Sequence, residues 1–366
     1  MLRAGIVGLP NVGKSTLFNA LTAQQSALAA NYPFATIEPN VGVVAVPDDR
    51  LEPLAKIVKT EKIVPATFEF VDVAGLVRGA SRGEGLGNKF LAHIRETDMV
   101  IQVVRCFEDE SVIHVEGSID PRRDVETVQI ELALSDLATV ERRRERSQKA
   151  AKAGDKSARA EMLVLDKLQA ALEQGTSARA IELSPDERTI VRNLFLLTIE
   201  PTIYAANVDE AALADREKNP HVRTLREIAR AEQAESVVIC AQLEAELVAL
   251  PPEERAQYLL SLGVPSSGVD RLIKKAYQLL GLISFLTAGE KEVRAWTVPR
   301  RTRAPQAAGT IHSDIERGFI RAEVISYEDL YRAGSYTAAR EKGLMRLEGK
   351  EYEIQEGDVV YFRFNV

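Results

Sequence analysis

One glycine-rich octapeptide constrains this chain more than any other feature. Residues 8–15 read Gly-Leu-Pro-Asn-Val-Gly-Lys-Ser, which fits the pattern G-x-x-x-x-G-K-[ST]. The motif follows a short apolar stretch, Arg3–Val7, that predicts a strand, and a helical pattern follows over Lys14–Ala23. Strand, glycine loop and helix in this order form the context in which the motif cradles phosphate groups. The sequence therefore predicts a P-loop that binds a nucleoside triphosphate.

The residues of this loop have distinct expected tasks. Its glycines let backbone N–H groups wrap the phosphates without Cβ clashes, and the helix N-terminus adds partial positive charge. The Lys14 ammonium would bridge the β and γ phosphates, and the Ser15 hydroxyl would ligate Mg²⁺. The residues expected to contact the nucleotide here are Asn11, Val12, Gly13, Lys14, Ser15 and Thr16.

Two further segments complete the predicted phosphate site. The motif Asp72-Val-Ala-Gly75 begins at the last residue of the strand predicted over Thr67–Asp72, whose apolar part is Thr67–Val71. There Asp72 would hold Mg²⁺ through water, and the Gly75 N–H would reach the γ-phosphate. Thr36 lies in the loop before the strand predicted over Val41–Val46, where it would close on the metal. The alternative for Thr36 is an ordinary loop threonine.

The expected base-binding segment departs from the usual guanine signature. GTP-binding domains read guanine with N-K-x-D, whose aspartate accepts bonds from N1–H and the 2-amino group. The matching stretch here is Asn207-Val-Asp-Glu210, in which the lysine is missing and glutamate replaces the aspartate. An acceptor displaced by a methylene cannot keep both bonds, and such sites are sensitive to unpaired groups. The stretch thus favours adenine, although a simple turn at a strand end is the alternative.

Adenine presents N7 as an acceptor and its 6-amino group as a donor. The Asn207 amide could serve N7, and the Val208 carbonyl could accept from the amino group. The next strand ends at Cys240-Ala241, so the Ala241 N–H could approach the ring.

Apolar periodicity divides the chain into three parts. Strands and helices alternate up to about residue 120, which predicts a mostly parallel sheet covered by helices. Helical spacing dominates residues 121–200, with a hairpin turn at Ala153–Asp155 and a capping box at Ser184–Glu187 that opens a helix through about Thr198. The other expected elements are helices over Leu86–Glu96, Val222–Glu232 and Val269–Leu280, and strands over Met99–Val104, residues 201–207, residues 236–240, Val293–Val298, Ile311–Phe319, Gly318–Val324 and Asp358–Phe364.

The return of strands after residue 200 makes the helical part an insertion. The predicted domains are a nucleotide-binding domain over residues 1–120 and 201–280, a helical hairpin over 121–200, and a small mixed α/β module over 281–366.

Together these motifs resemble the Obg-like ATPase family of the YchF type, over the whole chain. The resemblance implies a Ras-like P-loop G domain of the translation-factor class that prefers ATP to GTP. It also implies a coiled-coil insertion, a C-terminal TGS domain with a ubiquitin-like β-grasp fold, and association with ribosomes. The motifs that carry it are GLPNVGKST at 8–16, FATIEP at 34–39, DVAGLV at 72–77, GASRGEGLGNKFL at 79–91, NVDE at 207–210 and the tail from about 281.

The residue that orients the attacking water is not evident. Many GTPases place glutamine directly after D-x-x-G, but Leu76 occupies this position here. The family that the chain resembles is characterised by a hydrophobic residue at this position. His114, in a polar loop after a strand, is the candidate among four histidines, because a neutral imidazole can orient water near pH 7. Asn11 matches the P-loop asparagine of potassium-activated relatives, so K⁺ is an alternative source of assistance. A loop-shaping role for Asn11 also remains open. The expected catalytic residues are therefore His114, Lys14 and Gly75.

Positive charge is concentrated in two places on a chain whose net charge is −7. Arg142–Arg159, at the predicted hairpin tip, holds eight basic and two acidic residues, a net charge of +6. Arg294–Arg303 holds four arginines, with Trp296 among them. Clustered cations on an acidic protein suggest phosphate backbones as partners. With the resemblance, we expect the hairpin tip and the TGS domain to contact the ribosome or rRNA, although one patch alone would suggest a solvated helix face.

The composition is that of an ordinary soluble protein, with 45% apolar and 28% charged residues. No apolar run approaches the ~18 residues of a membrane span. Cys106 and Cys240 are far apart in sequence and are expected to be small buried hydrophobes, which indicates a reducing cytoplasm. We expect a cytoplasmic monomer.

The leading hypothesis is an ATPase that hydrolyses Mg-ATP in preference to GTP and whose nucleotide state controls ribosome association. A GTPase of the same fold is the first alternative, against which the absence of N-K-x-D counts. The second is a binding module in which turnover is negligible, which Leu76 keeps open.

Overall fold

The computed structural model describes residues 2–29, 40–73, 86–109, 111–115 and 117–365. The chain divides into two compact units, each with a six-stranded sheet. The first unit comprises Met1–Ala27, Ala35–Val44 and Glu69–Leu272, and the second comprises Leu28–Phe34, Ala45–Phe68 and Ile273–Val366.

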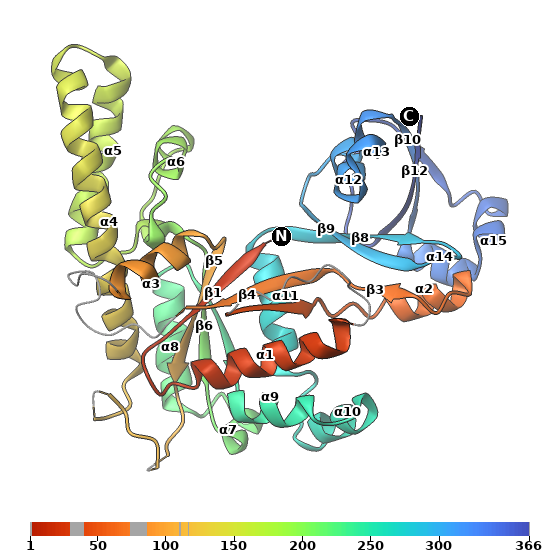
Figure 1. Cartoon of the computed structure of the whole chain (residues 1–366), viewed down its shortest axis with the longest axis horizontal. Coiled ribbons are helices and arrows are strands. Elements are labelled where there is room, and N and C mark those ends of the chain that lie inside the picture. Colours follow the sequence, from red (N-terminus) through yellow and green to blue (C-terminus); the bar gives the residue numbers. More distant parts are fainter. Residues whose placement is uncertain (1, 30–39, 74–85, 110, 116, 366) are drawn as a thin grey trace. The chain divides into compact units, whose positions relative to one another are not determined.

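The first unit is built on a sheet with the strand order β2-β4-β1-β5-β6-β7 (Figure 1). Strand β1 pairs in parallel with β4 and β5, and the parallel pairing continues through β6 to β7. Strands β5 and β6 are buried along their whole length, as expected of inner parallel strands covered on both faces. The strands are β1 Arg3–Val7, β2 Val41–Ala45, β4 Thr67–Asp72, β5 Met99–Arg105, β6 Thr202–Asn207 and β7 Glu235–Ile239.

Helices cover this sheet and close its core. One apolar cluster joins β5, β6 and β7 to the inner faces of α8 and α9, and both cysteines, Cys106 and Cys240, are buried in it. Helix α8 begins where the Asn219 side chain accepts hydrogen bonds from the N–H groups of His221 and Val222. The helices are α1 Lys14–Ala29, α3 Leu86–Arg95, α7 Glu210–Ala214, α8 Pro220–Ala231, α9 Ala241–Val248, α10 Pro252–Ser261 and α11 Gly268–Leu279, of which α11 continues into the second unit.

The predicted helical insertion lies between the neighbouring strands β5 and β6 and forms a long hairpin (Figure 1). Asp120 caps its first helix, and Gly154, with φ of +96°, makes the turn. The capping box at Ser184 is confirmed, but the helix that it opens ends at Arg192 rather than near Thr198. A separate 3₁₀ turn follows instead. The helical elements are α4 Pro121–Lys152, α5 Lys156–Glu173, η1 Ala178–Ala180, α6 Pro185–Arg192 and η2 Leu197–Ile199.

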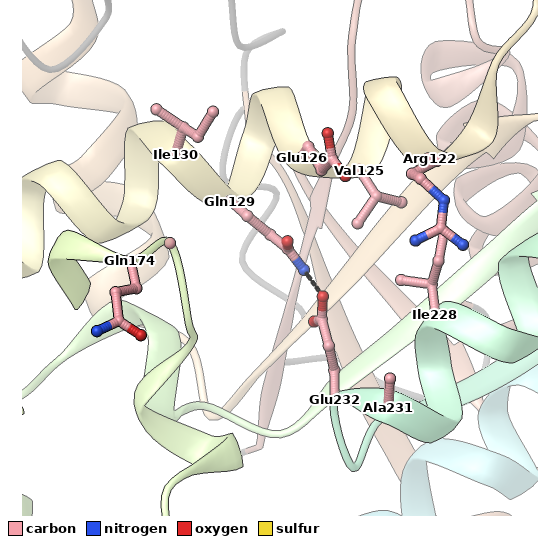
Figure 2. Close-up of a pocket in the computed structure, with 10 residues that line it drawn as sticks. Arg122, Val125, Glu126, Gln129, Ile130, Gln174, Ile228, Ala231 and Glu232 are labelled. Atoms are coloured by element: carbon pink, nitrogen blue, oxygen red, sulfur yellow. Dashed lines mark hydrogen bonds between the residues drawn. The ribbon is translucent and has the colours of Figure 1, made fainter. Parts of the chain in front are cut away.

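A buried polar network attaches the base of this hairpin to the central sheet. The Tyr204 hydroxyl on β6 donates to Glu232 at 2.6 Å, and Gln129 on α4 donates to Tyr204 at 2.8 Å. Arg179 forms an ion pair with Glu232 at 2.5 Å. Gln129 also donates a hydrogen bond to Glu232, as Figure 2 shows. Both side chains line a cavity of about 330 Å³ together with other residues of α4 and the end of α8. Since buried polar groups are costly to leave unpaired, this network holds α4 and β6 in one arrangement.

The second unit is a mixed sheet with the order β11-β10-β12-β8-β9-β3. Strand β12 pairs in parallel with β8. Strand β8 also pairs antiparallel with β9, and β10 pairs antiparallel with both β12 and β11. Helix α12 packs on the sheet over a core that includes Phe285, Ala308 and Phe362, which is the β-grasp arrangement. The elements are α2 Leu51–Val58, β3 Ile63–Val64, β8 Leu282–Ala288, β9 Val293–Pro299, α12 Ala304–Ile311, α13 Ser313–Arg317, β10 Phe319–Ser326, α14 Tyr327–Ala333, α15 Tyr336–Glu341, β11 Arg346–Glu348 and β12 Asp358–Phe364.

Two segments differ from the sequence-based expectations. Ile311–Phe319 is not a strand, because it holds the end of α12 and all of α13, and Ile311 and Ile315 pack together on the core at helical spacing. Ala45–Phe68, placed by prediction in the nucleotide domain, falls in the second unit, where β3 pairs with β9. A two-residue strand gives no sequence signal of the sheet that it joins. No helix among the described residues is long and apolar enough to cross a membrane.

Candidate nucleotide site

The glycine loop joins the carboxyl end of β1 to the first turn of α1, as predicted. Gly13 has φ of +90°, and a Cβ at this position would lie 2.2 Å from Asn207 Nδ2. Only glycine fits there. Asn11 also has positive φ, 63°, a conformation that asparagine adopts more readily than most residues. The Ser15 and Thr16 side chains are exposed, while Val12 is buried. The loop therefore leaves its hydroxyl groups open to a ligand.

The predicted phosphate lysine and metal aspartate lie together. Strands β1 and β4 are neighbours, with Ile6 in register with Asp72. Lys14 is only 9% exposed, and its Nζ forms an ion pair with Asp72 Oδ1. Charge pairing of this kind holds the ammonium at the mouth of the loop. Gly75, Thr36 and Leu76 lie outside the described residues.

Asn207 links the glycine loop to the ends of two strands. Its Nδ2 donates to the Val12 carbonyl at 2.9 Å, and its Oδ1 accepts from the Ala241 N–H at 2.9 Å. The side chain is nearly buried, at 4% exposure. The Asn207 amide and the Ala241 N–H, which were predicted to face the base, both already have partners within the protein. A primary amide has two N–H groups, so Asn207 keeps a second donor for a base.

Val208 and Glu210 differ in their surroundings. Val208 is 2% exposed, packs in the apolar core and donates its N–H to the Ile239 carbonyl at 2.8 Å. Glu210 opens α7, and its carboxylate accepts a hydrogen bond from the Tyr258 hydroxyl at 3.1 Å. The carboxylate at 210 is thus held in place beside the end of β6.

The structure places His114 against the first turn of α4. Its Nε2 lies 2.9 Å from Asp124 Oδ2, and the two side chains are 6% and 2% exposed. Burial raises the pKa of Asp124, and the hydrogen bond from His114 and the Arg123 charge oppose that rise. The neighbouring Ile113 carbonyl accepts a hydrogen bond from Asn11 Nδ2 at 3.1 Å. Two predicted site residues, Asn11 and His114, therefore belong to adjoining parts of one structure.

Arg105, which is not among the predicted site residues, organises the loop that leads to His114. It is the last residue of β5 and is 2% exposed. Its guanidinium donates to the carbonyls of Phe107, Asp109 and Val112 at 3.2, 3.0 and 2.9 Å. It also lies 4.5 Å from the centroid of the Phe107 ring. This segment, predicted to be a polar loop, is therefore held from within by Arg105. A lone arginine after the apolar strand Met99–Val104 was the only available sequence signal.

The basic hairpin tip is partly neutralised by acids on α5. Arg143 forms an ion pair with Glu161 at 2.7 Å, and Arg144 forms one with Asp166 at 2.7 Å. In the second patch Arg294 lies 4.4 Å from the Trp296 ring centroid, and Arg303 forms an ion pair with Glu351 at 2.8 Å. Six other basic residues of the tip are exposed, and none of them forms an ion pair with another residue that the structure describes: Arg142, Arg146, Lys149, Lys152, Lys156 and Arg159.

The predicted metal ligands have the chemistry that a divalent cation beside phosphates requires. Ser15 and Asp72 offer a hydroxyl and a carboxylate, the hard oxygen donors that Mg²⁺ prefers, and Mg²⁺ takes its other ligands from water and phosphate. Among the described residues there is no cluster of three or more His, Cys, Asp or Glu side chains suited to hold a metal. The fold and this loop together define a nucleotide-binding protein of the P-loop class.

Comparisons with known proteins give the family. One family model, described as a 50S ribosome-binding GTPase, matches residues 3–135, and a C-terminal YchF GTPase model, described as a protein of unknown function, matches residues 282–365. The ribosome-binding ATPase YchF of Bacillus subtilis (strain 168) is 54% identical over 365 residues, covering 100% of both chains. That of Pasteurella multocida (strain Pm70) is 52% identical, covering 100% of this chain and 99% of the relative. The chain belongs to the YchF family.

Solved structures agree with this assignment. The structure of the Schizosaccharomyces pombe YchF GTPase matches with a TM-score of 0.88 at 38% identity, covering 99% of this chain and 97% of that one. A GTP-binding protein from Pyrococcus horikoshii OT3 matches with a TM-score of 0.60 at 21% identity and covers 100% of both chains. The second likeness shows a shared fold.

Proposed function

We propose that this chain is an ATPase that binds Mg-ATP at the Gly8–Ser15 loop and hydrolyses it, with ATP preferred to GTP. The preference for ATP is supported by the residues at the end of β6. Asn207 lies beside Gly13, and residue 210 is a glutamate rather than the aspartate of the guanine signature. The printed names of the relatives differ on the nucleotide, because the bacterial proteins are ATPases by name and the S. pombe protein is a GTPase. In this proposal the residues at the base site determine whether ATP or GTP is preferred.

In the proposed mechanism each residue has a limited task. The Lys14 ammonium exchanges Asp72 for the β and γ phosphates, and the Gly75 N–H contacts the γ-phosphate. The second N–H of the Asn207 amide and the Val208 carbonyl would contact the base. The Ala241 N–H, which donates to Asn207 Oδ1, would lie beside it and hold that amide in place. Ser15, Thr36 and Asp72 would hold Mg²⁺, which would neutralise charge on the phosphates when bound.

The finer assignments of cations follow from the same residues. Mg²⁺ is the expected divalent ion because the donors are all oxygens. Asn11 is the expected K⁺ ligand, through its amide oxygen, since its Nδ2 already donates to Ile113. Potassium bound there would add positive charge near the phosphates, and it is the alternative to His114 as the source of catalytic assistance.

Base preference is expected to change when aspartate replaces Glu210. The shorter carboxylate restores the bidentate acceptor of the guanine signature, so the ATP-to-GTP affinity ratio should move toward GTP by about tenfold, or ~1.4 kcal/mol. A lysine at 208 would complete N-K-x-D, but Val208 is in the core, which makes Glu210→Asp the cleaner change. Competition binding of labelled nucleotides measures the ratio.

The matched control is Glu246→Asp, which makes the same chemical change on the exposed side of α9. It should leave the ratio unaltered. An unaltered ratio in Glu210→Asp as well would remove residue 210 from the base site.

The proposed partner is the ribosome, in keeping with the printed names of the bacterial relatives. The exposed cations at the hairpin tip without ion-pair partners support contact with rRNA phosphates. The small second unit, with its β-grasp sheet and the Arg294–Arg303 patch, is proposed to be a TGS domain that adds a second contact. Nucleotide state would control this association, which would place the protein in the cytoplasm, and a monomer suffices for it.

Ribosome association is expected to depend on the unpaired cations of the tip. Changing Lys149 and Lys152 to glutamate removes two cations that would neutralise rRNA phosphates and adds two negative charges that repel them. The fraction of protein that co-sediments with ribosomes at physiological salt should therefore fall by about tenfold or more. Nucleotide affinity should stay the same. The same four-unit charge change at Arg223 and Arg230, exposed on α8, is the control and should have a small effect. Equal loss in both variants would mean that net charge, rather than the tip, drives association.

The predicted domain division is also retained as a proposal. The nucleotide domain would comprise residues 1–120 and 201–280, the hairpin 121–200 and the TGS domain 281–366. The two compact units differ from this division in one respect, because Ala45–Phe68 belongs to the second unit.

A further inference from the structure

The loop that carries His114 is held from three directions. Arg105 ties its first half through three backbone carbonyls, and Asn11 ties it to the glycine loop through the Ile113 carbonyl. Asp124 binds the imidazole itself at 2.9 Å. Supporting contacts of this kind keep a functional side chain within a narrow range of orientations. The imidazole therefore has a defined direction and a defined partner.

The chemistry of the pair determines which imidazole nitrogen carries hydrogen. An ionised carboxylate only accepts hydrogen bonds, so the nitrogen facing Asp124, Nε2, must be the donor. In a neutral imidazole Nδ1 is then the acceptor. Arg123 Nη2, 3.4 Å from the other carboxylate oxygen, favours the ionised form of Asp124. With both side chains nearly buried, water does not compete for the bond.

We propose that Asp124 is a positioning residue that holds His114 in the Nε2–H tautomer, so that Nδ1 accepts a hydrogen bond from the attacking water. This inference rests on the proposed role of His114. In the reaction the water oxygen bonds to the γ-phosphorus while its proton passes to Nδ1 of His114, the bond from that phosphorus to the β–γ bridging oxygen breaks, and ADP leaves. The imidazolium then gives the proton to the released phosphate. Positive charge that builds on the imidazole is stabilised by Asp124. A buried aspartate orients the histidine of Ser-His-Asp triads in the same way.

Replacing Asp124 with asparagine tests this role at constant side-chain size. The amide of asparagine can donate to Nε2, which stabilises the other tautomer. We expect single-turnover ATP hydrolysis to slow by at least about tenfold, while the Kd for Mg-ATP changes by less than about twofold. Nitrogen-15 NMR of histidine-labelled protein should show hydrogen on Nε2 of His114 in the native chain and on Nδ1 in the variant. The signals of His114 are those lost in His114→Asn.

Asp136→Asn is the matched control, because Asp136 is a fully buried carboxylate on the same helix. Its oxygens accept from the Leu197 and Thr198 N–H groups, both at 2.8 Å, so its loss should lower the melting temperature without slowing hydrolysis. The double variant of Asp124→Asn with His114→Asn should be no slower than His114→Asn alone, since both changes act through one imidazole.

The outcomes separate the inference from the proposal beneath it. Slow hydrolysis in His114→Asn with native-like or faster hydrolysis in folded Asp124→Asn would reject the positioning role alone. Native-like hydrolysis in His114→Asn would reject the role of His114 and the inference with it. An Nδ1–H tautomer in the native chain would overturn the positioning geometry without any measurement of turnover.

Discussion

Alanine in place of Lys14 is expected to weaken Mg-ATP binding by at least about 100-fold, or ~2.7 kcal/mol, and to leave the protein folded. In the structure the Lys14 ammonium is at the mouth of the glycine loop, paired with Asp72. On binding it would exchange that single partner for two phosphate groups. Its removal takes away this charge-assisted contact, while the apolar core of the unit does not depend on it.

The fold of the variant must be checked, because Lys14 is only 9% exposed. The Asp72 side chain keeps 19% exposure, so water can solvate the carboxylate after its partner is lost. We therefore expect a small change in melting temperature without nucleotide. Lys56→Ala, on the surface of α2, is the control and should bind as the native chain does. Retained ATP affinity in a folded Lys14→Ala protein would contradict the phosphate assignment.

Loss of the His114 imidazole is expected to lower kcat by about tenfold at least, and by up to the ~10²–10⁴ typical of groups that assist proton transfer. Nucleotide affinity should be nearly constant, because the residue would act in the transition state. His114→Ala would leave the buried Asp124 carboxylate without its main partner, at a cost of about 1–3 kcal/mol. His114→Asn is therefore the better variant, since its amide can still donate to Asp124.

Single-turnover hydrolysis distinguishes His114 from the potassium alternative. Measured with K⁺ and with Na⁺, the native chain should differ between the two salts if Asn11 holds the ion, and Asn11→Ala should abolish that difference. A loop-shaping Asn11 would instead act through its bond to Ile113, and would slow hydrolysis equally in both salts. Native-like rates in His114→Asn under every condition, with ribosomes included, would leave His114 as a plain loop residue.

The sequence predicted the nucleotide-binding sheet well because its strands have strong local signals. Arg3–Val7 and Thr67–Asp72 have the predicted bounds, and Asp358–Phe364 does so in the second unit. The chain order of strands and helices then implied the insertion, since β5 and β6 are neighbours. The misassigned Ile311–Phe319 shows the limit, because a short apolar run with a turn on each side fits both periods.

Tertiary relations within the site were less accessible. Two separate motifs predicted Gly13 and Asn207 as site residues. No sequence pattern indicates that the Asn207 side-chain amide fills the space beside Gly13. His114 and Asp124 are ten residues apart across the start of a helix. Their pairing depends on how the loop folds back on α4, which Arg105 controls through backbone carbonyls that carry no sequence information.

The measurement that tests the account most directly is calorimetric titration of the full chain with ATP and with GTP, each with Mg²⁺. The account predicts that ATP binds more tightly, because Glu210 cannot pair both guanine donors while Asn207 can serve adenine N7. It also predicts phosphate and ADP as products of the bound ATP. GTP binding tighter than that of ATP by about tenfold, or ~1.4 kcal/mol, would contradict the central claim and make this protein a GTPase of the same fold.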